Sequence, residues 1–305
     1  MGKRFATIDV GSNSVLIYIA ERDEQGNWKQ IDDRAEITRL GEGLQTTGML
    51  KKEAMERTTE ALCKFVELAK SYGAEQIVAV GTMALRTAKN ADEFIKMVEE
   101  RCGLRIEVIS GEEEARLSYL AVKSGLKFPA ERIVIIDVGG GSTEFIFGRG
   151  DEIERKFSLN IGAIRFTETY LKSDPVKDEE LEAMLEALQS EIGELPMDFV
   201  PEALIGIGGT ITNLAAIKHK LEVYDPNVVD GTELTVDTVY QLMDMLRKMP
   251  IGERKKVPGL QPKRADVIVA GAGIVYTVMK LLGIHKLTVS VRGIRHGLMY
   301  DRFGK

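Results

Sequence analysis

Glycine-rich turns flanked by acids and hydroxyls are the residues of this chain best suited to chemistry on phosphate. The first turn is Asp9-Val10-Gly11-Ser12-Asn13-Ser14, and the second is Asp137-Val138-Gly139-Gly140-Gly141-Ser142-Thr143-Glu144. Glycines tolerate positive φ and let backbone N–H groups approach phosphate oxygens, while carboxylates suit a hard divalent cation. One such turn is a weak signal, but this chain carries the strand–Asp–x–Gly–Ser plan twice. The repeat predicts two copies of one domain with phosphates bound between them.

A third turn, Ile205-Gly206-Ile207-Gly208-Gly209-Thr210, leaves an apolar strand and enters a helical pattern. Its N–H groups and the helix dipole can face an anion or a nucleotide. A tight strand-to-helix turn without a ligand is the alternative. Because three such turns occur on one chain, we expect Gly208, Gly209 and Thr210 to contribute to phosphate binding.

The candidate general base lies in Ser110-Gly111-Glu112-Glu113-Glu114-Ala115-Arg116. Acids at a helix start usually act as caps or dipole partners, which accounts for Glu112 and Glu113. Glu114 instead shares a helical stripe with Leu117, Ser118 and Ala121, so we expect it to point inward. A partly desolvated carboxylate is suited to take a proton from water.

Two groups of cations are candidates for contact with a polyanion. Arg86 follows an apolar strand through Gly81-Thr82, and its guanidinium fork suits phosphate oxygens, with a surface salt bridge as the alternative. A second group has five cations within eleven residues. Such a run is usually a solvated face, but here it is also a candidate docking strip for a polyanion. The strip consists of Arg254, Lys255, Lys256, Lys263 and Arg264.

Composition narrows the class of protein. With 305 residues, 44% of them hydrophobic and 29% charged, the chain can form one oversized domain or two medium ones. The net charge of −6 argues against a DNA- or RNA-binding protein with a broad basic face. Cys63 and Cys102 show no metal-ligand spacing, so a disulfide is possible but not required. With no signal peptide and no long apolar run, we expect a cytoplasmic protein without a membrane partner.

Helical and strand patterns alternate as in α/β proteins. We place the domain boundary near residue 126, giving domains 1–125 and 126–305, with helix 295–305 as an open candidate for completing the first. An Asn90-Ala91-Asp92-Glu93 capping box is expected to open one helix. The histidines His219, His285 and His296 show no ligand spacing and are read as structural or exposed. The expected strands are 5–10, 15–21, 28–36, 76–80, 105–109, 133–137, 203–207 and 286–291, and the expected helices are 51–70, 90–102, 178–194, 208–218, 236–248 and 264–282, with two more starting near 110 and 294.

The chain resembles the exopolyphosphatase / guanosine pentaphosphate phosphohydrolase (Ppx/GppA) family of the actin–hexokinase–Hsp70 superfamily. The resemblance implies two RNase H-like domains with an interdomain cleft, and hydrolysis of terminal phosphates with Mg²⁺ or another divalent cation. It also implies that Glu114 is the base, that Asp137 and Glu144 surround the metal and the attacking water, and that Arg86 lies near the phosphate chain. We expect Asp9 to lie near the same metal. The resemblance rests on the glycine-rich turns and on Thr38-Arg39-Leu40-Gly41-Glu42-Gly43-Leu44, Gly81-Thr82, Leu85-Arg86, the Ser110–Arg116 run, Tyr224-Asp225-Pro226, Arg264-Ala265-Asp266 and Gly293-Ile294-Arg295-His296-Gly297.

Two departures from the family refine these expectations. Longer members carry C-terminal helical domains, and because this chain stops at Lys305 we expect no HD-type domain. Leu16 is apolar where some members have a basic residue able to touch guanosine tetraphosphate, which weakens the expectation of a response to that nucleotide, although Arg264 remains a candidate contact.

Inorganic polyphosphate is the first expected substrate and pppGpp the second. An ATP-dependent kinase or ATPase is the alternative enzyme class, because a fold does not determine its function. A catalytically inactive nucleotide-sensing module is the non-enzymatic alternative, and a homodimer is left open.

Overall fold

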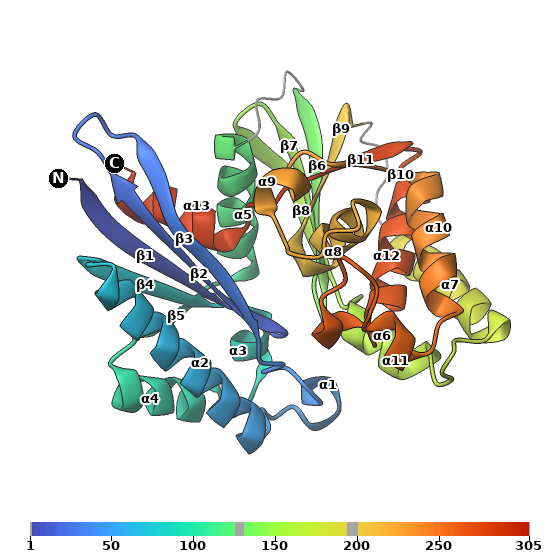
Figure 1. The fold of residues 1–305 in the computed structure, drawn as a ribbon, viewed down its shortest axis with the longest axis horizontal. Helices are drawn as coiled ribbons and strands as arrows, with labels where there is room; N and C mark the ends of the chain where they lie inside the picture. The colour runs from blue at the N-terminus through green and yellow to red at the C-terminus, as the bar shows by residue number, and fades with distance from the viewer. Residues whose placement is uncertain (1, 126–130, 194–200, 305) are drawn as a thin grey trace. The chain divides into compact units, whose positions relative to one another are not determined.

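The computed structural model describes residues 2–125, 131–193 and 201–304, which form two α/β units (Figure 1). The first unit takes its residues from 1–126 and 292–305, and the second from 127–291. The C-terminal helix α13 (Ile294–Phe303), whose assignment the sequence left open, is therefore grouped with the first unit.

The first unit is built on a five-stranded sheet in the order β3-β2-β1-β4-β5. Neighbours among β1, β2 and β3 pair antiparallel, whereas β4 and β5 continue the sheet in parallel. Side chains alternate along β1, so Thr7 and Asp9 share one face and Ala6, Ile8 and Val10 share the other. The strands are β1 (Lys3–Val10), β2 (Ser14–Arg22), β3 (Trp28–Ile37), β4 (Gln76–Gly81) and β5 (Ile106–Val108).

Helices cover both faces of this sheet. The helices α2 (Lys52–Ser71) and α4 (Ala91–Cys102) lie on one face, and α5 (Gly111–Gly125) and α13 lie on the other (Figure 1). Amphipathic spacing explains α2, whose buried side chains recur every three or four residues. Two short helices, α1 (Leu44–Thr47) and α3 (Met83–Thr87), lie in the connections.

A buried network of charged side chains connects helix α13 to the sheet of the first unit. Arg295 donates two hydrogen bonds, of 2.7 and 3.0 Å, to the Asp33 carboxylate on β3. His296 Nε2 lies 3.4 Å from the same carboxylate, and the Phe303 ring stacks on Phe5 with centroids 4.2 Å apart. Burial, with the nearby Arg295 charge, lowers the pKa of His296 to about 4, so this histidine is structural, as expected.

The second unit repeats the strand plan of the first. Its sheet has the order β10-β11-β9-β6-β7-β8, in which β8-β7-β6-β9-β11 matches β3-β2-β1-β4-β5 in order and in strand direction. This topology confirms the expected α/β class with two RNase H-like domains. The strands are β6 (Arg132–Val138), β7 (Thr143–Arg149), β8 (Glu152–Leu159), β9 (Ala203–Ile207), β10 (Glu233–Thr235) and β11 (Lys286–Val289).

The core of the second unit is organised around helix α12 (Ile268–Leu281). Small residues let its neighbours approach: a Cβ on Gly271 would lie 2.5 Å from the Thr210 methyl, and one on Gly273 would lie 2.5 Å from Met184. No helix of the described ranges is both long enough and apolar enough to cross a membrane. The other helices are α6 (Ala163–Tyr170), α7 (Asp178–Gly193), α8 (Gly208–Lys218), α9 (Pro226–Val229), α10 (Val236–Arg247), α11 (Ile251–Arg254) and the 3₁₀ turn Pro262–Arg264.

The expected strands and long helices are present within a few residues, with three differences. The Asn90 capping box is wrong, because the Asn90 side chain bonds the backbone N–H and carbonyl of Leu50 at 2.8 and 3.0 Å instead. The helix expected from residue 264 begins at Ile268, after a 3₁₀ turn. The edge strands β8 and β10, the helix α6 and the short helices α1, α3, α9 and α11 were not anticipated. Both cysteines, Cys63 and Cys102, are free thiols.

Candidate functional site

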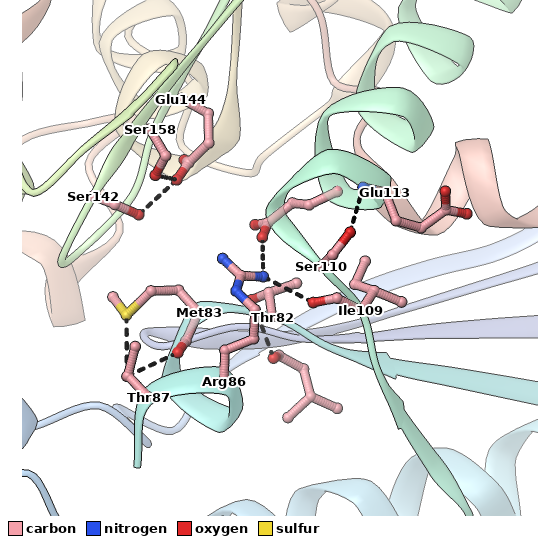
Figure 2. Close-up of polar contacts among 12 residues, drawn as sticks. Thr82, Met83, Arg86, Thr87, Ile109, Ser110, Glu113, Ser142, Glu144 and Ser158 are labelled. Carbon is pink, nitrogen blue, oxygen red and sulfur yellow. Dashed lines mark hydrogen bonds and ion pairs between the residues drawn. The ribbon is translucent and has the colours of Figure 1, made fainter. Parts of the chain in front are cut away.

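The first unit pairs the candidate base with the candidate phosphate-binding arginine. Arg86 lies on α3, directly after β4, and Glu114 lies in the first turn of α5, which follows β5. Because β4 and β5 are parallel neighbours, the residues after their C-terminal ends meet at one edge of the sheet. Arg86 Nη1 donates to Glu114 Oε2 at 2.6 Å and to the Ile109 carbonyl at 3.1 Å. Figure 2 shows the hydrogen bond between Arg86 and Ile109.

Glu114 is the buried acid of its cluster. Its side chain is 11% exposed, compared with 30% for Glu113, which confirms the inward orientation expected from the helical stripe. Burial raises the pKa of Glu114, and the hydrogen bond and charge of Arg86 oppose that rise. A carboxylate held in this way is a better proton acceptor near neutral pH than an ordinary surface glutamate.

Glu113, the acid next to Glu114, lies at the start of α5 but does not complete a capping box there. Ser110 Oγ accepts a hydrogen bond from Glu113 N at 3.1 Å, so Ser110 caps α5 (Figure 2). The Glu113 carboxylate accepts two hydrogen bonds from Arg116, at 2.7 and 2.8 Å, instead of returning to the cap. The backbone N–H of Glu113 is therefore part of the helix cap, whereas its carboxylate is not.

The first two glycine-rich turns have the same closure. Gly11 N donates to Ser14 O at 3.0 Å, and Gly139 N donates to Ser142 O at 2.9 Å. Each turn joins the central strand of its sheet to an antiparallel neighbour, β1 to β2 and β6 to β7. The predicted phosphate loops, Gly11–Ser14 and Gly139–Ser142, are thus equivalent parts of the two units.

The acids beside the loops differ between the units. Asp137 lies directly opposite Glu144 across the β6–β7 hairpin, so both carboxylates share one face of the sheet. The residue opposite Asp9 is the apolar Leu16. The duplicated domains have therefore diverged, and only the second hairpin carries a carboxylate on both of its strands at this position.

Glu144 is held by two hydroxyl groups. Its Oε1 accepts hydrogen bonds from Ser142 Oγ at 2.7 Å and from Ser158 Oγ at 3.0 Å (Figure 2). Ser158 lies on β8, a strand that sequence patterns missed, so its contribution could not be anticipated. One donor lies in the β6–β7 turn and the other lies on β8, so two separate segments orient the Glu144 carboxylate.

The donor chemistry of Asp137 and Glu144 fits Mg²⁺. This ion takes one or two carboxylates, keeps several waters and shares the phosphates of its substrate, so it does not need a site made entirely of protein ligands. Within residues 2–125, 131–193 and 201–304, no three His, Cys, Asp or Glu side chains form a group able to hold a metal alone. Asp9, the third expected ligand, is 9% exposed and occupies the position in β1 equivalent to Asp137 in β6.

The third turn packs directly against Asp137. Gly208 has φ +85°, and a Cβ there would lie 2.2 Å from Asp137 Oδ1, so only glycine allows α8 to start at this place. The Thr210 hydroxyl is buried and donates to the Val138 carbonyl at 3.2 Å. The Thr210 side chain therefore connects α8 to β6, and the expected phosphate binding by this turn depends on the backbone N–H groups of Gly208–Thr210.

The expected cationic docking strip is wrong for Arg254. This side chain is buried, with the residue 1% exposed, and it donates to the carbonyls of Met249 and Ala265 at 2.9 and 2.8 Å. It also lies 3.6 Å from the Asp174 carboxylate. Three backbone and charge partners satisfy the buried guanidinium, which serves the fold of this loop and is not available to a polyanion.

The remaining cations of the strip do not act as one surface. Arg264 is half-buried against the start of α8, where its Nη2 would lie 2.1 Å from a Cβ on Gly209. Lys255, Lys256 and Lys263 are exposed and remain the candidates for docking a polyanion.

Comparison with known proteins gives one consistent family. The sequence model of the Ppx/GppA phosphatase family matches residues 18–305. Exopolyphosphatase 2 of Mycobacterium tuberculosis (strain H37Rv) is 33% identical over 322 residues, covering 99% of both chains. A crystal structure of the Aquifex aeolicus member of the Ppx/GppA protein family superposes with a TM-score of 0.83 and 37% identity, covering 98% of this chain and 97% of that one.

Two other relatives are much longer than this chain. The guanosine-5'-triphosphate,3'-diphosphate pyrophosphatase of Photobacterium profundum is 31% identical over 99% of this chain, which spans 59% of its length. The bifunctional 3-dehydroquinate synthase/phosphatase of Fusobacterium nucleatum is 33% identical over 93% of this chain, which spans 44% of its length.

Proposed function

The chain belongs to the Ppx/GppA phosphatase family, and we propose that it is an exopolyphosphatase that releases terminal phosphate from inorganic polyphosphate. The observation that carries the proposal is the buried Glu114 carboxylate hydrogen-bonded to Arg86 at the ends of two parallel strands. Phosphoanhydride hydrolysis needs a base for water and a cation for the phosphates, and this pair supplies both kinds of group.

In the proposed reaction, Glu114 accepts a proton from water while the water oxygen attacks the terminal phosphorus. The bond from phosphorus to the bridging oxygen breaks, and the shortened chain leaves as an anion together with inorganic phosphate. The burial that raises the pKa of Glu114 supports this role, because it makes the carboxylate more basic. Arg86 orients that carboxylate and neutralises phosphate charge.

The two hairpin loops and their acids have the remaining roles. Backbone N–H and hydroxyl groups of Gly11–Ser14 and Gly139–Ser142 bind phosphate oxygens. Asp137 and Glu144 are the proposed Mg²⁺ ligands, with Asp9 as the third candidate. When bound, the cation would offset the charge that develops on the transferred phosphoryl group.

Polyphosphate is favoured over pppGpp by the residue at position 16. Leu16, which lies opposite Asp9 on β2, adds no charge for a guanosine nucleotide. We therefore keep pppGpp hydrolysis as the second candidate.

A phosphate-release assay tests the proposal. Long-chain polyphosphate, tripolyphosphate, pppGpp and ATP are each supplied with Mg²⁺ and without a phosphoryl acceptor. An exopolyphosphatase releases phosphate most efficiently from polyphosphate. Release from pppGpp alone would favour the second candidate. A requirement for an added acceptor would show a kinase, and tight nucleotide binding without phosphate release would show a sensing module.

A further inference from the structure

In the second unit, the carbonyl oxygens of the glycine-rich loop are bound by the start of helix α6. Ala163 N donates to Gly139 O at 2.9 Å, while Ile164 N and Arg165 N donate to Gly140 O at 2.9 and 3.3 Å. The first N–H groups of a helix have no partner within the helix. Here loop carbonyls satisfy three of them, so the start of α6 binds the loop and is not itself an anion site.

In the first unit the carbonyl oxygens of the glycine-rich loop are also bound by backbone N–H groups, but these come from the segment 38–41 and not from a long helix. Gly41 N donates to Ser12 O at 2.8 Å, while Thr38 N and Arg39 N donate to Asn13 O at 3.1 and 2.9 Å. Arg39 has φ +52°, an unfavourable value for a residue with a side chain. Such backbone strain persists where the surrounding contacts require it, and it is concentrated at functional sites.

Binding the carbonyls determines where the loop N–H groups point. In a trans peptide the C=O and the following N–H lie in the peptide plane and point in opposite directions. The N–H groups of Gly140 and Gly141 are therefore directed away from α6, and those of Asn13 and Ser14 are directed away from the 38–41 segment. Consecutive N–H groups directed to one side form a concave binding site for an anion.

We infer that residues 162–165 and residues 38–41 are positioning segments, which orient the N–H groups of the two loops toward phosphate oxygens. The inference rests on the proposed function for its ligand, a phosphate group. It assigns a role to residues that lie outside the loops and need not touch the substrate.

Gly162 is the residue through which this inference can be tested most directly. A Cβ on Gly162 would lie 2.3 Å from Gly140 O and 2.4 Å from the carbonyl carbon of Gly141. Both neighbours are backbone atoms, so they can yield only if the loop moves. Gly162 has φ −141°, so glycine is needed here for space and not for an unusual backbone conformation.

The first experiment compares Gly162→Ala with Gly252→Ala, where the added Cβ has nothing within 4 Å. We expect Gly162→Ala to raise KM for tripolyphosphate about tenfold or more, because small displacements of binding groups weaken binding strongly. We expect kcat to change much less and the pH profile to keep its shape, since Glu114 is untouched. Gly252→Ala should match the wild type. A wild-type KM in a folded Gly162→Ala variant would overturn the inference.

The second experiment observes the loop itself. Titration of the ¹⁵N-labelled full chain with inorganic phosphate should shift the Gly140 and Gly141 amide signals, with weaker affinity in Gly162→Ala. Ala163→Pro removes the hydrogen bond to Gly139 O at a position where a helix accepts proline, and it should weaken phosphate affinity in the same way. If Gly162→Ala does not fold, the phosphate affinity of Ala163→Pro tests the inference instead.

The outcomes separate the inference from the proposed function. If the wild type hydrolyses no phosphoanhydride but phosphate still shifts the Gly140 and Gly141 amides, and does so more weakly in the variants, the positioning role stands and the proposed function fails. If phosphate shifts neither amide, or binds both variants as tightly as the wild type, the positioning role fails whatever the substrate is.

Discussion

The Arg86 guanidinium and the Glu114 carboxylate form a 2.6 Å charged hydrogen bond between two helices that follow adjacent parallel strands. Burial raises the pKa of Glu114, whereas Arg86 acts in the opposite direction. The basicity of the candidate base therefore depends on a residue from another segment of the chain.

We predict that Glu114→Gln lowers phosphate release by about 10²–10⁴-fold, because glutamine cannot accept the proton of the attacking water. Glu113→Gln is the matched control, since that carboxylate pairs with Arg116 at the half-exposed surface. Glu112→Gln should also have a small effect. Steady-state rates and circular dichroism check the prediction, and a fully active, folded Glu114→Gln variant would refute the assignment of the base.

Replacing Arg86 should change the pH dependence of kcat/KM. Glu114 must be ionised to accept a proton, so activity falls as the pH drops through its pKa. Arg86 lowers that pKa, and Arg86→Gln should therefore move the acid limb to higher pH. Profiles of both proteins on tripolyphosphate provide the measurement. An acid limb that stays in place or moves to lower pH would exclude Glu114 as the titrating group.

Asp137→Asn and Glu144→Gln should each raise the Mg²⁺ concentration needed for half-maximal activity and lower the maximal rate. An amide lacks the negative charge that a hard cation requires. Asp151→Asn, in the exposed turn between β7 and β8, serves as the control of the same chemistry. Full activity of Asp137→Asn in excess chelator would remove the cation from the proposed reaction.

Docking of long polyphosphate should depend on the exposed lysines and on salt. The triple change of Lys255, Lys256 and Lys263 to Gln should raise KM for long chains and leave kcat on tripolyphosphate nearly unchanged. KM for long chains should also rise more steeply with salt in the wild type than in the triple variant. Salt screens the lysine–phosphate contacts, because the Debye length falls from about 10 Å at 0.1 M to about 3 Å at 1 M. Equal salt slopes and equal KM values in the wild type and the triple variant would mean that these lysines form only a solvated surface.

Arg254→Gln, in contrast, should lower Tm, since it removes a buried guanidinium with several partners.

Stability should fall between pH 6.5 and 4 because of His296. Its pKa is lowered to about 4 in the folded protein, so in this window the unfolded chain takes up a proton that the folded one does not. Linkage then removes roughly 3 kcal/mol of stability as the pH falls through the window. Denaturant unfolding of His296→Gln should show a flatter pH dependence, with the exposed His285→Gln as control. An unchanged slope in His296→Gln would contradict this account.

Local patterns in the sequence determined most of the strands, the long helices and the duplicated loop plan. Apolar runs ending in Asp9 and Asp137 and followed by glycines identify strand ends, because these signals depend only on neighbouring residues. The inward position of Glu114 could be read from its helical stripe for the same reason. These features are local, so no knowledge of distant contacts was needed.

Tertiary structure decided every property that depends on partners distant in the sequence. Arg254 belongs to a run of cations that looks like an exposed surface, and only the approach of Met249, Ala265 and Asp174 shows that it is buried. The hydroxyl of Ser158 reaches Glu144 through a polar edge strand whose pattern is weak. The pairing of Arg86 with Glu114 likewise depends on the order of strands in the sheet. Burial and hydrogen-bond partners arise from long-range packing, which periodicity along the chain does not encode.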